Sequence, residues 1–109
     1  MLYAENLKKA DIDISTSGDN TIISAPSSGY IAIDHINFIP TSDVTVQLKD
    51  GTVSYGGAYP LSAKQAFTIE NAIQNEHGVI TIRPGQAFII NLDGAVQVSG
   101  FVRYRIIGE

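Results

Sequence analysis

The chain has 109 residues, of which 44% are hydrophobic, and this argues against disorder and for one domain with a real core. Only 17% of the residues are charged, below the usual share of about 25%, which suggests that partners cover part of the surface. The net charge is −4 and the basic residues are scattered, so we expect no nucleic-acid partner. The absence of cysteine excludes disulfides and thiolate chemistry.

No apolar run approaches the ~18 residues of a membrane span. The first residues, MLYAENLKKAD, also lack the apolar core of a signal peptide. We therefore expect no membrane partner and synthesis in the cytoplasm of the producing cell.

Polar and apolar residues alternate with period two through most of the chain, which predicts β-strands. In chain order the expected strands cover residues 11–15, 21–25, 30–39, 44–49, 66–70, 79–82, 87–92 and 96–107. Turn clusters lie at 17–20 and 26–29, and Asp50-Gly51 is a strong hairpin signal. Residues 52–60 are interpreted as a loop with a ragged edge strand, and 71–77 as a loop.

About eight or nine short strands at this spacing are typical of an all-β sandwich or barrel. No segment keeps a helical period, and no repeat or linker divides the chain. We expect a β-sandwich domain at 11–109 and an arm at 1–10. The alternation predicts ten inward-facing residues: Ile31, Ile33, Val44, Val46, Leu48, Phe88, Ile90, Leu92, Val98 and Val102.

The acidic stretch that begins at Asp11 invites comparison with a calcium loop, because alternate oxygens can wrap a hard cation. An EF-hand loop needs Gly at its sixth position and Glu at its twelfth, where this chain has Thr16 and Ile22. We therefore interpret Asp11 and Asp13 as the solvent face of a strand, and predict no metal site and no cofactor.

The two histidines, His35 and His77, are far apart in the sequence. Asp34 and His35 are adjacent on a strand, so they point to opposite faces and cannot form the base and orienting acid of a triad. No serine lies in a nucleophile elbow, and Glu76-His77 lacks the second histidine of a zinc-protease helix. We predict no catalytic residues and no enzymatic activity.

The segment from Gly51 to Pro60 could present Tyr55 and Tyr59 to a sugar ring, because glycines let a loop fit closely. The other interpretation is a sheet edge, with Tyr59 packed against it and a bulge at the glycine pair. The edge interpretation is favoured, and the ligand loop is kept as the alternative.

Five segments carry a resemblance to a known family: DISTSGDNTI at 13–22, GYIAI at 29–33, VTVQLKDG at 44–51, YPLSA at 59–63 and PGQAFIINLDGAVQVSGFVRY at 84–104. Their order resembles small β-sandwich proteins of tailed bacteriophage virions, which occur as head decoration (cement) proteins and as modules of other virion components. The resemblance covers about residues 11–106, and the arm has no counterpart in it.

The resemblance implies a jelly-roll-like antiparallel β-sandwich in which Asp93-Gly94 turns the chain between the last two strands. Gly100 then allows a bend or a close backbone approach. The implied function is non-enzymatic: a capsid decoration protein on the outer surface of the phage head. Its expected partners are the major capsid protein and further copies of itself, with a trimer favoured. The alternative is a receptor- or carbohydrate-binding module of a tail or fibre, with a host-surface glycan as ligand.

The arm contains apolar residues that have no position in the first strand. Free in solution, these side chains would expose apolar surface, which soluble proteins limit. We therefore expect the arm to lie against a neighbouring subunit, with the basic pair at the rim. The candidate interface residues are Leu2, Tyr3, Leu7, Lys8 and Lys9.

Overall fold

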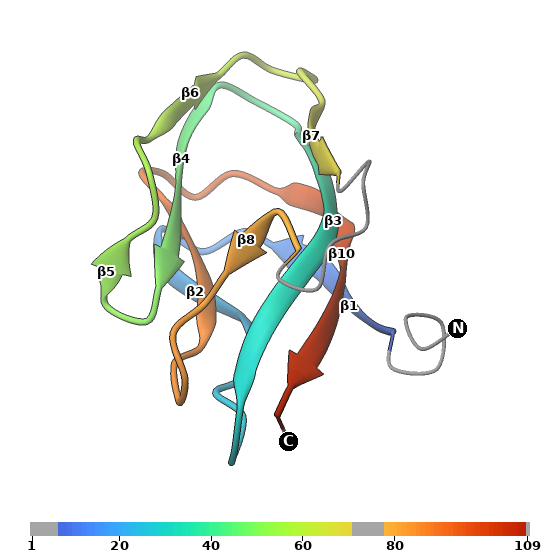
Figure 1. Cartoon of the computed structure of the whole chain (residues 1–109). Helices are drawn as coiled ribbons and strands as arrows, with labels where there is room; N and C mark the ends of the chain where they lie inside the picture. The colour runs from blue at the N-terminus through green and yellow to red at the C-terminus, as the bar shows by residue number, and fades with distance from the viewer. Residues whose placement is uncertain (1–6, 71–77, 109) are drawn as a thin grey trace.

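The computed structural model describes residues 7–70 and 78–108, which form ten β-strands in two antiparallel sheets (Figure 1). The strands are β1 (Lys8–Ile14), β2 (Gly18–Ile23), β3 (Tyr30–Pro40), β4 (Val44–Asp50), β5 (Val53–Ser54), β6 (Tyr59–Leu61), β7 (Phe67–Glu70), β8 (Ile80–Thr81), β9 (Phe88–Leu92) and β10 (Val98–Ile107). No described residue is helical.

The two sheets have equivalent strand orders. Sheet A runs β1-β10-β3-β7, with β8 also pairing with β3, and sheet B runs β2-β9-β4-β5, with β6 also pairing with β4. The first four strands alternate between the sheets, and the last two return to fill the gaps at β9 in sheet B and β10 in sheet A. This double wrapping is the jelly roll, and it confirms the expected fold class.

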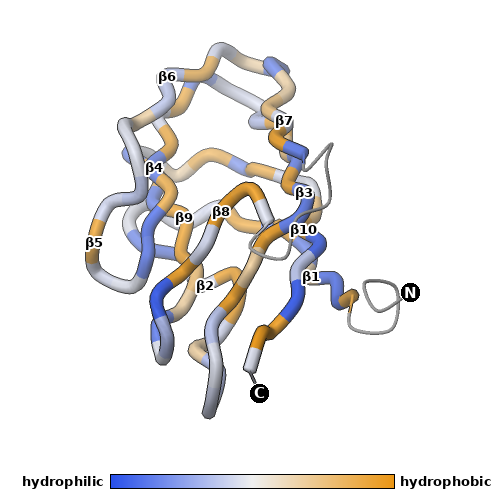
Figure 2. Tube along the Cα trace, viewed as in Figure 1, coloured by the Kyte–Doolittle hydropathy of each residue, from blue (hydrophilic) through white to orange (hydrophobic). Residues whose placement is uncertain are grey.

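The core lies between the sheets, where alternate residues of strands such as β4 and β9 are buried. All ten predicted inward-facing residues are at most 5% exposed. Figure 2 shows hydrophobic positions on both sheets, β3, β8 and β9 among them. Further buried members of the core, outside these ten, are Ile12, Ile23, Ile36, Phe38, Leu61, Ile80 and Ile82.

Strand β3 changes its inward-facing positions in the middle. Ile31 and Ile33 face the core in the first half, whereas Ile36 and Phe38 face it in the second half. Such a change from odd to even positions needs one extra residue, which is a β-bulge. The register against β10 shifts at this point, so that His35 lies opposite Arg103 and Ile33 opposite Tyr104. The bulge thus lets both halves of β3 contribute to one core.

Several expected boundaries were wrong. Residues 18–20 belong to β2 and not to a turn, because they pair in register with residues 90–92 of β9, and the side chain of Asn91 donates to Asp19 across the sheet at 2.7 Å. Residues 8–10 belong to β1 and not to the arm, since they pair with β10 in unbroken register. In residues 52–60 the expected ragged edge strand is present as the short strands β5 and β6 beside β4. The expected loop at 71–77 lies outside the described residues.

The segment at Asp93-Gly94 carries the chain from sheet B to sheet A, because β9 and β10 lie in different sheets. Asp93 exchanges hydrogen bonds with Thr45: its N–H donates to the Thr45 carbonyl (3.2 Å), and its Oδ1 accepts from the Thr45 N–H (2.9 Å). The predicted turn is therefore a crossing between sheets that is anchored to β4.

Replacement of a central core residue should lower stability strongly. Ile90→Ala removes a fully buried side chain of β9, and we expect the free energy of unfolding to fall by about 2–5 kcal/mol. Chemical denaturation measures this, with Val53→Ala at an exposed position as the control, expected within about 0.5 kcal/mol of the parent. An unchanged midpoint for Ile90→Ala would contradict the assigned core.

Gly94 and Gly100, at the crossing and in the strand that follows it, differ in the space available for a side chain. A Cβ atom on Gly100 would overlap the Asn37 carbonyl oxygen and the backbone of Phe38, whereas one on Gly94 would meet nothing within 4 Å. Gly100→Ala should cost about 1–3 kcal/mol as backbone is forced apart, and Gly94→Ala much less. Equal unfolding midpoints for the two variants would show that β3 and β10 do not approach this closely.

Candidate binding surface

The outer face of sheet A carries three rows of side chains that cross the strands. Odd residues of β1 and β10 point away from the core here, as do His35, Asn37 and Ile39 of β3 beyond the bulge. The strand register gives the rows as Lys9–Arg103–His35–Glu70, Asp11–Phe101–Asn37–Thr68 and Asp13–Ser99–Ile39. We call these eleven residues the outer face.

An aromatic stack lies at the centre of the outer face. The rings of His35 and Phe101 are 5.3 Å apart and nearly parallel, at 13°. The guanidinium carbon of Arg103 lies 5.7 Å from the centre of the Phe101 ring, within the range of a cation–π contact. Phe101 thus contacts two neighbouring side chains of the outer face.

Polar contacts hold His35 in this stack. The amide nitrogen of Asn37 lies 3.3 Å from Nε2 of His35, and it donates when that nitrogen carries no proton. On the other side, a carboxylate oxygen of Glu70 lies 3.7 Å from Nδ1. The outer face therefore presents an aromatic ring and a guanidinium, two types of side chain enriched in protein interfaces, beside an imidazole.

A shallow hollow of about 290 Å³ continues the outer face on the side of β7. Its lining is mostly apolar, and Ile39 beside it is 42% exposed. The lining residues are Asn37, Phe38, Ile39, Ala66, Thr68 and Ser99. An exposed isoleucine next to a hollow gives the surface a place for an apolar side chain of a partner.

A buried ion pair lies on the same side of sheet A at the β3 bulge. Arg105 is only 4% exposed, and its guanidinium donates to both carboxylate oxygens of Asp34, at 2.7 and 2.8 Å. The two-bond geometry is the strong form of this contact. It holds the bulge residue against β10 next to the aromatic stack.

Sequence reasoning missed the outer face. The available signal was that Val98 and Val102 were expected to face inward, which places Phe101 and Arg103 outward on the same strand. An aromatic residue at an outward position is a candidate contact residue for a partner. The partners on β3 could not be found in this way, because the strand register and the bulge bring His35 and Phe101 together.

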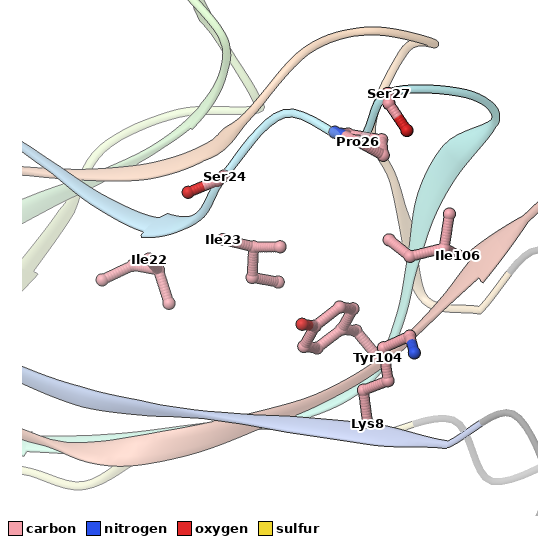
Figure 3. A pocket seen from close by; sticks show the side chains of 8 residues that line it. All are labelled: Lys8, Ile22, Ile23, Ser24, Pro26, Ser27, Tyr104 and Ile106. Carbon is pink, nitrogen blue, oxygen red and sulfur yellow. The ribbon is translucent and has the colours of Figure 1, made fainter. Parts of the chain in front are cut away.

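A second opening lies between the sheets, where the start of β1 and the end of β10 face the end of β2. Its volume is about 490 Å³. Figure 3 shows Tyr104 and Ile106 from β10 facing Ile23 and Pro26 across the open space. The lining residues are Lys8, Ile22, Ile23, Ser24, Pro26, Ser27, Tyr104 and Ile106.

The predicted arm residues fall in different places. Leu2 and Tyr3 lie outside the described residues, and Leu7 is 40% exposed. Lys8 lines the opening between the sheets, and Lys9 lies on the outer face, where its ammonium donates to Asp11 at 2.8 Å. The role of the arm as an interface stays a prediction.

Tyr55 and Tyr59, the alternative ligand residues, are both partly buried and contact the core. The ring of Tyr59 meets Phe67 edge-on at 4.6 Å, and Phe67 in turn stacks on Phe38 at 4.7 Å. This packing gives Tyr59 a structural role at the sheet edge, and ligand binding by the pair stays a prediction.

The acidic residues of the stretch compared with a calcium loop lie on different strands, Asp13 on β1 and Asp19 on β2, and each has hydrogen-bond partners elsewhere in the chain. Asp13 accepts from Gln97, while Asp19 accepts from Asn91 and from Lys49 on sheet B. The hydrogen bond from Asn91 and, after it, the Lys49 ammonium hold the pKa of Asp19 below its ordinary value. Among the described residues no three His, Asp or Glu side chains gather as a metal site. The expected absence of metal, cofactor and catalysis stays a prediction, and His77 lies outside the described residues.

Comparison of the chain with protein-family models, with curated proteins and with solved structures found no match. Within the described ranges no helix is long and apolar enough to span a membrane.

Two arginines of β10 should differ in their contribution to stability. Arg105→Ala leaves Asp34 without its buried partner, and we expect a loss of about 3–5 kcal/mol in the free energy of unfolding. Arg103→Ala, two residues away and exposed, should cost less than about 1 kcal/mol. Urea denaturation of both variants measures the difference, and similar losses would show that the ion pair does not stabilise the bulge.

Proposed function

We propose that this protein is a non-enzymatic structural protein of a phage virion, and that it decorates and stabilises the head shell. The observation that carries the proposal is the outer face of sheet A. It supports binding of a broad protein surface, because its contact groups lie across four strands. The jelly-roll fold agrees with the virion family that the sequence resembles, in which head decoration proteins occur beside modules of other virion components.

The composition of the outer face favours a protein partner over a small ligand. Arg103 and His35 both contact the Phe101 ring, so this ring is already engaged by side chains of its own chain. Exposed Arg103 and Ile39 offer one polar and one apolar contact, with charged side chains at the rim of the face. A central anchor with a polar rim is the usual anatomy of a protein interface.

Stabilisation of the shell would follow from mass action. A protein that binds only the assembled shell lowers the free energy of that state by an amount set by its concentration and affinity. The rigid sandwich matters here, since a preorganised surface loses little entropy on binding. The major capsid protein is the proposed partner, and copies of this chain would bind as a homo-oligomer on the outer surface of the head.

The location of the protein in virus particles tests the proposal. Particles produced from the encoding genome are labelled with a gold-tagged antibody against the purified protein and viewed by electron microscopy. Label on heads is expected. Label confined to tails or fibres would favour the receptor- or carbohydrate-binding alternative, which binding to a glycan array would test. Unlabelled particles would overturn the proposal.

Variants of the outer face test which surface binds. The double variant Phe101→Ser/Arg103→Glu, added to heads that lack the protein, should co-sediment at least about tenfold more weakly than the parent. Val53→Ser, at an exposed position of sheet B, is the control and should bind like the parent. Thermal unfolding of each variant separates loss of binding from loss of folding. Equal binding by the double variant would exclude the outer face as the interface.

A further inference from the structure

We propose that the outer edge of β1 pairs with β1 of a second copy, antiparallel and centred on Ala10, so that two A sheets join into one. This inference goes beyond the proposed function, because it concerns contact between copies and not contact with a shell. It rests on the edges of the two sheets and on the charges along β1.

The edges of the sheets are unequal. On sheet B, β2 is interrupted by a register shift near its end, β5 has two residues, and β6 has three with Pro60 among them. On the far side of sheet A, β7 has four residues and β8 has two. Short strands, bulges and proline are the devices that keep sheet edges from pairing with other chains.

Strand β1 is neither short nor bulged and contains no proline; of the protective devices it has only charged side chains, Lys8 and Lys9 among them. It runs for seven residues, and all seven pair with β10 in unbroken register. β10 pairs with one edge of β1, and no strand within residues 7–70 and 78–108 pairs with the opposite edge of β1. β1 therefore offers the longest regular open edge in the described part of the chain.

The charges on β1 suit pairing with a copy of itself. Its outward side chains are Lys9, Asp11 and Asp13, with the positive charge near the start and the negative charges toward the end. Charges of a single sign would repel a second copy of the same strand, as an edge protected against pairing does. An antiparallel copy instead places the positive end of one strand against the negative end of the other.

The positions of the charges select one register. With Ala10 opposite Ala10 of the second copy, each Lys9 lies opposite the other copy's Asp11. Lys9 already contacts Asp11 of its own chain at 2.8 Å, so four charges alternate in sign around the two-fold axis. A register shifted to centre on Asp11 would place two aspartates directly opposite one another, which is unfavourable.

Charge exchange tests this contact in the full chain. Sedimentation equilibrium at ~0.15 M salt, where the Debye length is about 8 Å, should show a monomer–dimer equilibrium for the parent. Lys9→Glu places two like-charged pairs across the axis and should weaken the dimer at least about fivefold. The exchange variant Lys9→Asp/Asp11→Lys restores opposite charges in the proposed register, and its dimer constant should return to within about twofold of the parent.

Lys64→Glu is the matched control, since it makes the same change of net charge at an exposed position outside the strands, and it should dimerise like the parent. Thermal unfolding checks that every variant is folded. A monomeric parent, a trimer such as the resemblance implies, an equal effect of Lys64→Glu, or an exchange variant that stays monomeric would each overturn the proposal. Because no virion is used, failure here leaves the proposed function to its own test.

Discussion

The architecture depends on one change of face in the middle of β3. This strand is the centre of sheet A, and it supplies core residues at Ile31 and Ile33 before the bulge and at Ile36 and Phe38 after it. Without the extra residue at Asp34, one of these pairs would point to solvent, because side chains alternate along a strand. The bulge leaves a carboxylate on the outer side of the sheet, and Arg105 of β10 neutralises it with two hydrogen bonds. The bulge at Asp34 therefore determines which residues of β3 enter the core, how β3 is aligned with β10, and which side chains of β3 lie on the outer face.

The fold class was predictable from the sequence because alternation alone assigns most strands and their inner faces. All ten predicted inward residues, Phe88 and Val98 among them, are buried. Strand ends were less predictable. Gly18 to Asn20 has turn composition, yet the stretch pairs with β9 and extends β2, and Asp19 accepts a hydrogen bond from Asn91 across the sheet. Local composition cannot show this, since the partner Asn91 is 72 residues away.

The outer face could be predicted only in part, for the same reason. Period two places Phe101 and Arg103 outward, but it does not identify what lies beside them. His35 and Phe101 belong to strands far apart in the sequence, and the shift at Asp34 decides which residues of β3 and β10 become neighbours. The interaction of these side chains is thus a product of register. Sequence reasoning turned instead to Tyr55 and Tyr59, whose glycine-rich surroundings are a local signal, and the structure gives Tyr59 a packing contact with Phe67.

The two proposed contacts use different directions of the same sheet. Pairing along β1 acts in the plane of sheet A, in the direction of the strand hydrogen bonds, whereas a partner on Phe101 would approach perpendicular to that plane. The row Lys9–Arg103–His35–Glu70 connects them, because its first residue lies at the paired edge and its third in the aromatic stack. A second copy at β1 would place two such rows in line and double the width of the outer face. Two modest contacts held in one rigid surface bind more tightly than either alone, since the second forms at a high effective concentration. Edge pairing would therefore strengthen binding to a repeating surface without any new contact to it.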